Sequence, residues 1–404
     1  MPVERVVGSV NRRTFLSAAG AGASGAWPAA AAPESAQFLW PRNQAYLNSA
    51  GLHPISVATR KAIDRVLDYQ TQGPGPGRQP VDEETADHVR SLYARLIHAQ
   101  PHEIAFIQST QVAENIVTDG LGLPEAGGNI VTDEFHFHGG LYHLKELEQQ
   151  GVELRIVKPR NWRIELADLE RAVDRHTKLV SLTLVSNTNG FVHDAKAVAD
   201  LAHAHGAYFY ADVIQAAGCM PLDVRASGID FCGAATYKWL MGLHGFGYLY
   251  VREELHERLR TRRYGSQHYR NFEYKGFPTD TSFSWDPAPG AAKYEIGSFS
   301  DLALAAQHES LGYLLETGVA RIQKQVFPLT SRIRREVAAL GYQSMTPEES
   351  PAPIASFLLR DPEATAEKLR RANVIAKVKW GQLRISPSIF NTQQDVDRLL
   401  EALA

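Results

Sequence analysis

Short apolar segments alternate with amphipathic segments along most of the chain. Three apolar runs, 178–186, 207–214 and 231–236, have the length and composition of strands, and a helical pattern at about 195–206 separates the first two. Continuously apolar strands that alternate with helices are typical of a parallel sheet buried on both faces. We therefore predict an α/β protein whose centre is a mostly parallel sheet sandwiched by helices.

The same alternation extends to both sides of this central region. The predicted strands outside it are 103–108, 129–137, 153–160 and 244–253, and the predicted helices are about 54–71, 82–98, 139–150 and 166–175. Residues 261–292 lack periodicity, so we predict loops around a site or an interface there. Further helices and short strands, ending with a helix at about 393–403, indicate a smaller α+β domain. We place the large domain at 33–300 and the small domain at 301–404.

Polar side chains stand at the ends of the three central strands. Asn187 stands at the end of the first strand, Asp212 and Gln215 at the end of the second, and Tyr237 and Lys238 at the end of the third. Ligands of such sheets bind beyond the carboxyl ends of the strands, where these side chains would meet. A lysine, a carboxylate and an amide suit an aromatic aldehyde cofactor, because the amine forms a Schiff base and the carboxylate pairs with a protonated ring nitrogen. The pattern predicts a pyridoxal 5′-phosphate (PLP) enzyme.

A predicted strand at 103–108 leads directly into a helix through Ser109 and Thr110. The start of a helix presents free N–H groups and favours a phosphate, so this is a candidate anion site. The alternative is that Ser109 or Thr110 only caps the helix. Lys238 elsewhere in the chain favours the phosphate site.

His136 ends the predicted strand 129–137 and is placed to cover one face of a pyridine ring. His136 and His138 also form a His-x-His pair, but no carboxylate cluster with ligand spacing accompanies them, so we predict no metal site. Cys219 and Cys232 fit neither a zinc spacing nor a disulfide framework, and we expect both to fill space near the sheet.

The composition changes this picture little, except at the N-terminus. A formal net charge of -3 over 404 residues gives no reason to expect nucleic acid or a membrane surface as a partner. Residues 1–32 contain a paired arginine, Arg12 and Arg13, and then an uncharged run rich in Ala and Gly, as in a twin-arginine signal peptide. We expect export to the periplasm, or a cytoplasmic protein if this leader is not functional. No other segment is apolar enough to span a membrane.

These landmarks together resemble the class V aminotransferase family of fold-type I PLP enzymes, which includes cysteine desulfurases, kynureninases and isopenicillin N epimerase-like proteins. The similarity spans about 44 to 403 and rests on segments such as FIQSTQVAENI, VSNTNG, YADVIQAAG, ATYKWLMG, YEIGSFS and QLRISPSIFNTQQDVDRL. It implies a seven-stranded sheet in the large domain and a homodimer with the site at the interface.

The resemblance also implies roles for individual residues. Lys238 would be the Schiff-base lysine and Arg384 would hold the substrate carboxylate, a task that suits a planar guanidinium. The remaining positions would bind the cofactor: Thr110, Gln111 and Tyr237 at the phosphate, His136 on the ring face, Asn187 and Gln215 near the phenolic oxygen, Asp212 on the ring nitrogen, and Ser298 reaching the phosphate of a partner subunit.

The sequence departs from the family pattern at one decisive place. The segment AKVKWGQLRIS has no cysteine where desulfurases carry their nucleophile, which disfavours persulfide formation. We expect an aminotransferase acting on an α-amino acid, with a lyase or an epimerase as the alternative. A catalytically silent PLP-binding relative and a nicotinamide dehydrogenase are rivals of other classes. The dehydrogenase is disfavoured because the only glycine pattern, GAGASG at 20–25, follows no strand.

Overall fold

The computed structural model describes residues 37–39, 43–275 and 282–404. The predicted leader at 1–32 lies outside the described residues. Within the described ranges, no helix combines the length and the apolar character needed to cross a membrane.

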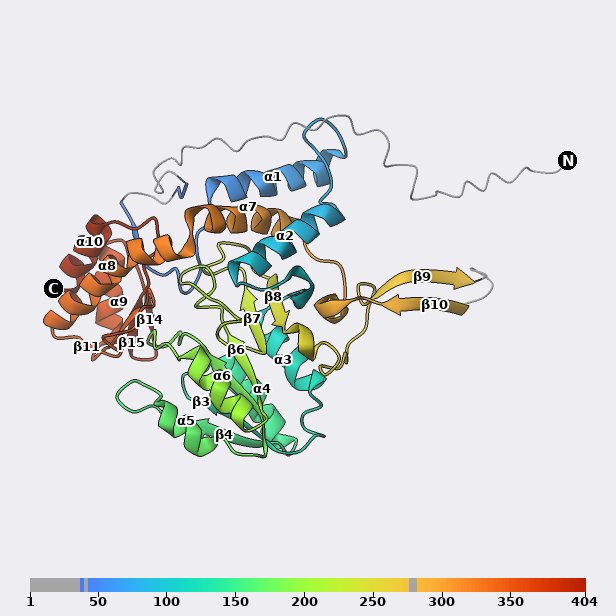
Figure 1. Cartoon of the computed structure of the whole chain (residues 1–404). Helices are drawn as coiled ribbons and strands as arrows, with labels where there is room; N and C mark the ends of the chain where they lie inside the picture. The colour runs from blue at the N-terminus through green and yellow to red at the C-terminus, as the bar shows by residue number, and fades with distance from the viewer. Residues whose placement is uncertain (1–36, 40–42, 276–281) are drawn as a thin grey trace.

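A seven-stranded sheet forms the centre of the molecule, as predicted (Figure 1). From one edge to the other the strands are β2 (Ile104–Ile107), β8 (Gly247–Val251), β7 (Phe231–Ala235), β6 (Tyr208–Asp212), β5 (Thr177–Thr183), β3 (Asn129–Asp133) and β4 (Glu153–Val157). The strands from β7 to β4 pair in parallel, and β8 pairs antiparallel with both of its neighbours. The central strands are buried almost throughout, which explains why their sequences are continuously apolar.

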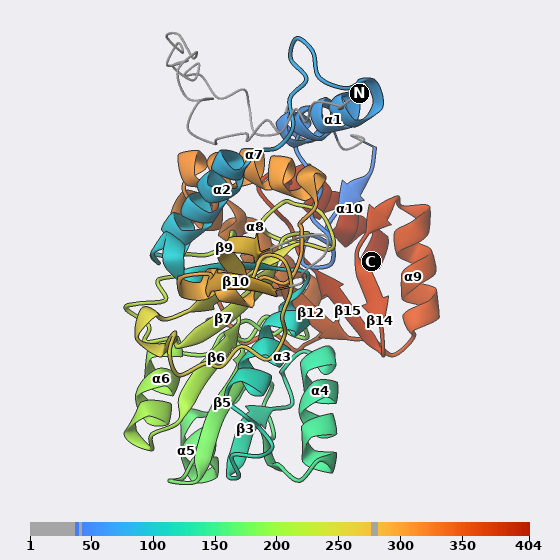
Figure 2. The same ribbon diagram turned by 90° about the vertical axis from the view of Figure 1, so that its right-hand side faces the viewer.

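Helices cover both faces of this sheet. On one face the core includes side chains of α2 (Glu83–Leu96), α5 (Leu166–Ala172), α6 (Ala195–Ala204) and α7 (Asp301–Thr317), with α1 (Val57–Gln72) packed on α7. On the other face it includes side chains of α3 (Thr110–Gly120) and α4 (His138–Gln149). Figure 2 shows the layers side on, with α3 and α4 on one side of the strands and α6 on the other. Short 3-10 helices complete the connections: η2 (Pro101–Glu103), η3 (Glu253–Leu255) and η4 (Gly290–Tyr294).

A smaller sheet lies beside the large one in the C-terminal region. Its antiparallel strands are, in order, β11 (Gln343–Ser344), β12 (Ala355–Leu358), β15 (Gln382–Ile385) and β14 (Lys377–Lys379), and its helices are α8 (Val319–Ala339), α9 (Pro362–Arg371) and α10 (Gln393–Leu403). The short strand β1 (Ala45–Tyr46) pairs in parallel with β13 (Val374–Ile375). The beginning of the described chain therefore packs against its C-terminal region.

Two predicted elements differ from the structure. The strand predicted at 129–137 ends at Asp133, because the Asp133 carboxylate accepts the N–H of Phe135 at 2.6 Å and the chain turns. The region 261–292 contains a hairpin, β9 (Tyr269–Lys275) and β10 (Ser282–Pro287), where we predicted loops. The hairpin projects from the body of the molecule (Figure 1), so its strands carry no buried stripe that periodicity could detect.

Candidate active site

Lys238 and Asp212 share one pocket at the carboxyl ends of neighbouring strands. Asp212 is the last residue of β6, and Lys238 follows the end of β7 in the adjacent loop. Both side chains are buried. The pocket holds about 340 Å³, its mouth included, and is lined by Ser109, Thr110, Gln111, Phe137, Asp212, Ile214, Ala235, Tyr237 and Lys238. The structure thus brings together a lysine, a carboxylate and the first turn of α3.

The environment of Lys238 makes its amine unusually acidic. Burial lowers the pKa of Lys238 to about 7; the Asp212 charge opposes this shift, and the Arg384 charge adds to it. The Nζ atom lies 5.7 Å from the ring centroids of both Phe137 and Tyr237. A large fraction of Lys238 is therefore neutral, and nucleophilic, near pH 7.

Asp212 is a buried carboxylate that makes no ion pair among the described residues. One of its oxygens, Oδ1, accepts the N–H of Ile214 at 3.0 Å, and the hydroxyl of Thr183 lies 3.5 Å from Oδ2. Burial raises the pKa of Asp212, and the N–H of Ile214 and the charges of His136 and Lys238 oppose this shift without cancelling it. A cation in the pocket would reverse this shift.

The first turn of α3 forms another wall of the pocket. Ser109 is the N-cap and accepts the N–H of Val112 at 3.3 Å, while the hydroxyl of Thr110 accepts the N–H of Ala235 at 3.0 Å. The capping role considered from sequence is therefore real for Ser109. It is compatible with an anion site, since a helix start also carries N–H groups without partners inside the helix and the positive end of the dipole. Ser109, Thr110 and Gln111 all line the pocket.

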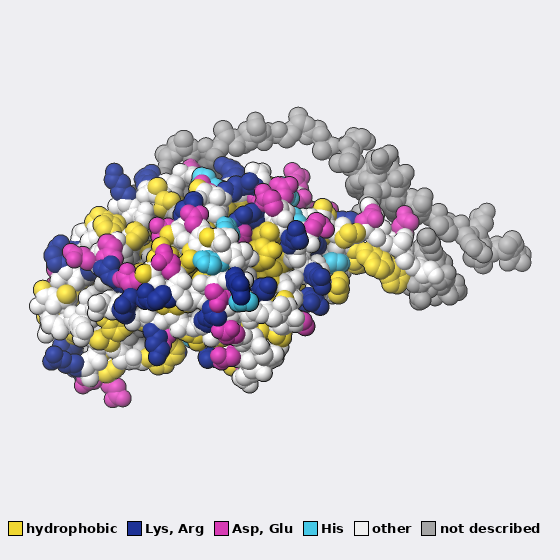
Figure 3. Space-filling model, turned by 60° about the horizontal axis from the view of Figure 1, so that its bottom comes forward, with side chains coloured by type: hydrophobic (Ala, Val, Ile, Leu, Met, Phe, Trp, Pro, Cys, Tyr) yellow, Lys and Arg dark blue, Asp and Glu magenta, His cyan; other side chains and the backbone are white. Residues whose placement is uncertain are grey.

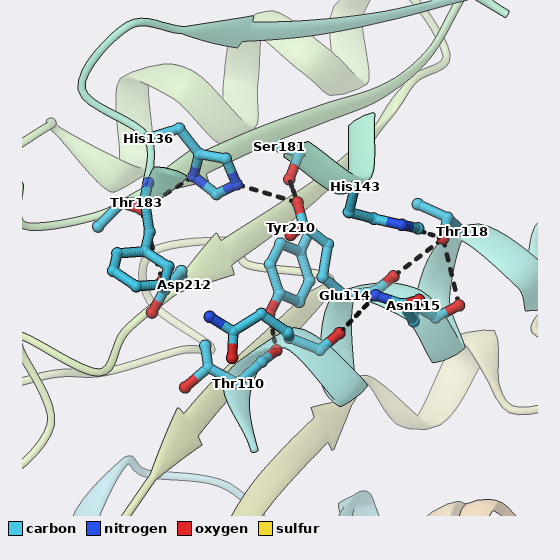
Figure 4. Close-up of polar contacts among 12 residues, drawn as sticks. Thr110, Glu114, Asn115, Thr118, His136, His143, Ser181, Thr183, Tyr210 and Asp212 are labelled. Carbon is cyan, nitrogen blue, oxygen red and sulfur yellow. Dashed lines mark hydrogen bonds and ion pairs between the residues drawn. The ribbon is translucent and has the colours of Figure 1, made fainter. Parts of the chain in front are cut away.

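His136 does not line this pocket, and the neighbouring Phe137 does. The turn that follows Asp133 directs the two rings differently. The ring of His136 is buried beside α3 and β5, with Nδ1 2.8 Å from the hydroxyl of Thr183 and Nε2 3.0 Å from the carboxylate of Glu114 (Figure 4). Phe137 is therefore a second candidate for covering a bound ring, and the ring-covering role of His136 stays a prediction.

Gln215 and Asn187 also lie outside the lining of the Lys238 pocket. The amide of Gln215 is fully buried, donates to the carbonyl of Ala50 at 3.0 Å and accepts from the indole of Trp239 at 2.7 Å. Asn187 lines a second pocket, and its carbonyl accepts from Arg384 at 2.9 Å. In this structure Gln215 holds two loops of the fold together, which its position after β6 could not indicate.

Arg384 lines the second pocket, and its guanidinium is only partly satisfied. Besides the bond to Asn187, one Nη atom lies 3.5 Å from the side-chain oxygen of Asn48, and the buried Nε has no hydrogen-bond partner among the described residues. Burial lowers the pKa of Arg384 to about 10, and Tyr237 opposes the shift. A buried cation with a free donor is poised to receive an anion.

Tyr237 and Ser298 differ in their placement. Tyr237 lines the Lys238 pocket, and its ring stacks on His244 with a centroid separation of 4.0 Å. Ser298 is exposed in the segment between η4 and α7 and lines neither pocket. Within one chain, Ser298 is therefore separate from the site.

A buried polar chain behind the pocket was not predicted from the sequence. Glu114 of α3 accepts from His136, and Ser181 of β5 donates to Glu114 at 2.5 Å (Figure 4). Thr183, two residues further along β5, links His136 to Asp212. The signal was present, because Ser181 and Thr183 are polar at a spacing of two in the apolar stretch that follows Lys178, so both point to one face.

Both cysteines are buried and unbridged in the core. Cys219 lies in the turn region after β6, and Cys232 lies within β7. Neither lines the Lys238 pocket or the Arg384 pocket. Burial raises the pKa of both thiols.

Comparison with known proteins identifies the class of protein that this fold and site define. The family model of class V aminotransferases, described as "Aminotransferase class-V", matches residues 80–399. The chain belongs to this family, whose cofactor is pyridoxal 5′-phosphate.

Relatives of the chain cover nearly its whole length. A "Probable cysteine desulfurase" of Methanothermobacter thermautotrophicus is 25% identical over 386 residues, covering 90% of this chain and 94% of the relative. The "Uncharacterized aminotransferase YcbU" of Bacillus subtilis is 25% identical over 381 residues, covering 92% and 97%. Among solved structures, the apo cysteine desulfurase of Thermococcus onnurineus superposes with a TM-score of 0.76 at 20% identity, covering 89% and 93%. The protein C-DES superposes with a TM-score of 0.81 at 18% identity, covering 92% and 99%.

The residues of the Lys238 pocket fit pyridoxal 5′-phosphate. The buried carboxylate of Asp212 lacks an ion-pair partner among the described residues, which suits a protonated ring nitrogen. The start of α3 suits a phosphate, and the ring of Phe137 suits one face of a pyridine. The amine of Lys238 stands in the same pocket.

Proposed function

We propose that this protein is a PLP-dependent aminotransferase that acts on an α-amino acid and attaches its cofactor through Lys238. The observation that carries the proposal is a buried lysine, with a pKa of about 7, in one pocket with the buried carboxylate of Asp212. Neither side chain is there to stabilise the fold, because burying a charge without a close partner costs free energy. Perturbed ionisable groups of this kind mark functional sites.

The cofactor, when bound, supplies an electron-withdrawing ring that stabilises negative charge at the substrate Cα. Asp212 keeps the ring nitrogen protonated, and the chain from Thr183 to Glu114 orients Asp212. The start of α3 and Tyr237 hold the phosphate, and Phe137 covers one ring face. Asn187 and Gln215 do not line the pocket in this structure. For either to approach the phenolic oxygen of the cofactor, the chain around it would have to rearrange locally.

Lys238 and Arg384 divide the remaining work between two neighbouring pockets. Arg384 binds the α-carboxylate of the substrate through its partly satisfied guanidinium. The Nζ amine of Lys238, freed from the cofactor, moves a proton on and off the substrate Cα as a general acid and base. Its pKa of about 7 suits both directions of this transfer at neutral pH.

A persulfide-forming desulfurase is disfavoured, although several relatives carry that name. The chain has two cysteines, Cys219 and Cys232, and both are buried away from the two pockets. Burial raises the pKa of both thiols, so neither is a ready thiolate. No thiol of this chain is placed to receive sulfur from a substrate.

A lyase is the second candidate, because elimination needs no thiol of the enzyme. One structural neighbour, which superposes with a TM-score of 0.78 at 18% identity, is the cystine C-S lyase C-DES in complex with cysteine persulfide. The same lysine, carboxylate and arginine would serve either reaction. Product analysis separates the two: an aminotransferase releases a keto acid with the substrate side chain intact, and a lyase releases pyruvate and a leaving group.

The deciding experiment is the absorbance spectrum of the purified protein with PLP and a panel of amino acids. We expect a band of covalently bound cofactor that one amino acid converts. We expect Lys238→Ala to lose both the band and turnover, while Lys61→Ala, a change at an exposed lysine on α1, keeps both. Full turnover in Lys238→Ala would refute the assignment. A wild-type protein without the band would favour a silent scaffold or a dehydrogenase.

We also propose a homodimer in which the hairpin β9–β10 packs against a second copy. An isolated two-stranded hairpin is marginally stable in water, yet this one projects from the body and carries the exposed Phe283 and Trp285. Figure 3 shows hydrophobic side chains gathered along this arm. Exposed Ser298 would then reach the phosphate site of the partner. Light scattering tests this: a Phe283→Ser/Trp285→Ser variant should be monomeric, and a monomeric wild type would refute the proposal.

Residues 1–32 are proposed to direct export through the twin-arginine route. The support is the paired arginine and the uncharged run behind it. Cell fractionation tests the proposal, with Arg12→Lys/Arg13→Lys as the variant expected to stay in the cytoplasm. Equal distribution of the variant and the wild type would refute it.

A further inference from the structure

The pocket of Arg384 contains more positive charge than the binding of one carboxylate explains. Lys377 and Lys379 of β14 and Gln382 and Arg384 of β15 all line it. Lys377 stands directly opposite Arg384 in the antiparallel pair, and Lys379 stands opposite Gln382. Since side chains two apart point to one face, all four project from the same side of the small sheet. Like charges directly opposite each other repel.

No acidic side chain balances these cations within the pocket. The lining consists of Trp162, Asn187, Thr188, Met345, Leu358, Lys377, Lys379, Trp380, Gln382 and Arg384, all of them described residues, and none is Asp or Glu. Lys377 is half-buried and makes no ion pair among the described residues. Burial, together with the charges of Arg384 and Lys379, lowers the pKa of Lys377 to about 8.

Lys379 already interacts with an aromatic ring, whereas Lys377 interacts with none in the described part of the chain. The Nζ atom of Lys379 lies 4.0 Å from the ring centroid of Trp380, which is largely exposed at the rim. Lys377 has no such ring partner among the described residues and stands opposite Arg384 in the paired strands. An anion held between the strands would satisfy Lys377 and remove its repulsion with Arg384.

The shape of the pocket limits what this anion can belong to. Its empty space is about 770 Å³, mouth included, and Trp162, Met345 and Leu358 supply apolar walls. An amino acid whose α-carboxylate binds Arg384 would extend its side chain along the same face of the sheet. The Lys377 amine then meets the end of that side chain, and the apolar walls meet its methylene groups.

We propose that the substrate is an α-amino acid with an anionic side chain, and that Lys377 binds the side-chain anion. This inference rests on the proposed function, because it assigns the α-carboxylate to Arg384. Lys377 acts on specificity alone and takes no part in proton transfer.

The test compares acidic amino acids with their neutral isosteres in the holoenzyme. The KM values of L-aspartate and L-glutamate are compared with those of L-asparagine and L-glutamine. L-cysteate and O-phospho-L-serine are tested in addition, as substrates with a sulfonate and a phosphate side chain. We expect a KM for the best acidic substrate that is lower than that of its neutral counterpart by about tenfold or more, as for one charge-assisted hydrogen bond. Lys377→Gln should abolish this preference, and Lys61→Gln, the matched loss of an exposed charge, should preserve it.

A binding measurement without turnover accompanies this test. Calorimetric titration with succinate, set against butyrate, reports whether the site of the intact protein holds a second carboxylate. Succinate should bind the wild type and Lys61→Gln more tightly than butyrate, and Lys377→Gln should bind both equally weakly.

The outcomes separate this inference from the proposed function. The inference is overturned if neutral amino acids have a KM as low as that of acidic ones, or if the preference for acidic ones survives in Lys377→Gln. Either result leaves the proposed aminotransferase activity unaffected. A wild-type protein that shows no band of bound cofactor, or whose band no amino acid converts, overturns the proposed function. The succinate titration then still decides the anion site: selective loss in Lys377→Gln supports it, and unchanged binding refutes it.

Discussion

The Nε2 atom of His136 lies 3.0 Å from the Oε1 atom of Glu114, and both side chains are buried behind the candidate active site. Burial alone would raise the pKa of Glu114 and lower that of His136, but the charge and hydrogen bond of each partner reverse both shifts. Both pKa shifts favour the ionised form of the pair. With His136 protonated, Thr183 accepts from Nδ1 of His136 and from the N–H of Phe137, so its own hydrogen is free for Asp212.

The first prediction follows from the pH dependence of this pair. The raised pKa of His136 contributes stability below about 6.5, its unfolded value, and this contribution is lost as pH rises through the folded value. The lowered pKa of Glu114 contributes above about 4.5 and is lost as pH falls through the folded value. We expect Glu114→Gln to lower the free energy of unfolding by roughly 3 kcal/mol between about pH 4.5 and pH 6.5. The loss should be smaller at pH 9.

Urea denaturation at pH 5.5, 7.5 and 9 measures this effect. Glu170→Gln, at an exposed position on α5, is the control and should cost little at any of these pH values. A loss from Glu114→Gln that is the same at all three pH values would show that the carboxylate does not pair with a protonated His136.

The second prediction distinguishes Phe137 from His136 at the cofactor. Phe137→Leu keeps the apolar wall but removes the aromatic face, so we expect affinity for PLP to fall by roughly two- to tenfold. His136→Gln should lower the free energy of unfolding and change cofactor affinity less. Fluorescence titration with PLP measures both affinities. Should His136→Gln weaken PLP binding more than Phe137→Leu, the ring-covering role belongs to His136, as the sequence predicts.

The third prediction concerns the pH at which Lys238 reacts. Because burial lowers its pKa to about 7, the neutral fraction of the amine rises steeply between pH 6 and 8 and then levels off. The rate at which the apo protein captures PLP should follow the same curve, as recorded by stopped-flow absorbance. Free Nα-acetyl-lysine, with an ordinary amine, should keep accelerating to about pH 10. A protein rate that also climbs to pH 10 would contradict the low pKa.

The fourth prediction concerns Arg384. The variant Arg384→Lys keeps a positive charge at this position but loses the planar guanidinium, which binds a carboxylate through two hydrogen bonds. We expect the KM for the amino acid to rise roughly ten- to a hundredfold with a smaller change in kcat, as for the loss of a charge-assisted hydrogen bond. Steady-state kinetics measure the split between the two constants. Arg258→Lys, at an exposed position, should change neither constant; an unchanged KM in Arg384→Lys would remove Arg384 from the site.

The sequence predicted the central sheet well because burial on both faces leaves a continuous apolar signal. The predicted strands 207–214 and 231–236 correspond to Tyr208–Asp212 and Phe231–Ala235, and the tail helix predicted at 393–403 is Gln393–Leu403. Asp212 and Lys238 were found for the same reason, since the carboxyl ends of parallel strands meet at one edge. Their shared pocket was a consequence of topology.

What the sequence could not predict depends on contacts between distant residues. The turn at Asp133 leaves Phe137 in the lining of the Lys238 pocket, while His136 contacts Thr183 and Glu114. The indole of Trp239 and the carbonyl of Ala50 engage the amide of Gln215, and neither contact leaves a periodic trace. The charge of the Arg384 pocket also escaped prediction, because it depends on the register that sets Lys377 opposite Arg384.

The pairing of β1 with β13 determines the order in which the molecule can be completed. Ala45 is synthesised long before its pairing partner Val374. The large sheet, whose strands end at Val251, can form long before Val374 is made. The segment at 45–46 must therefore wait, and its pairing with β13 follows the formation of the large sheet.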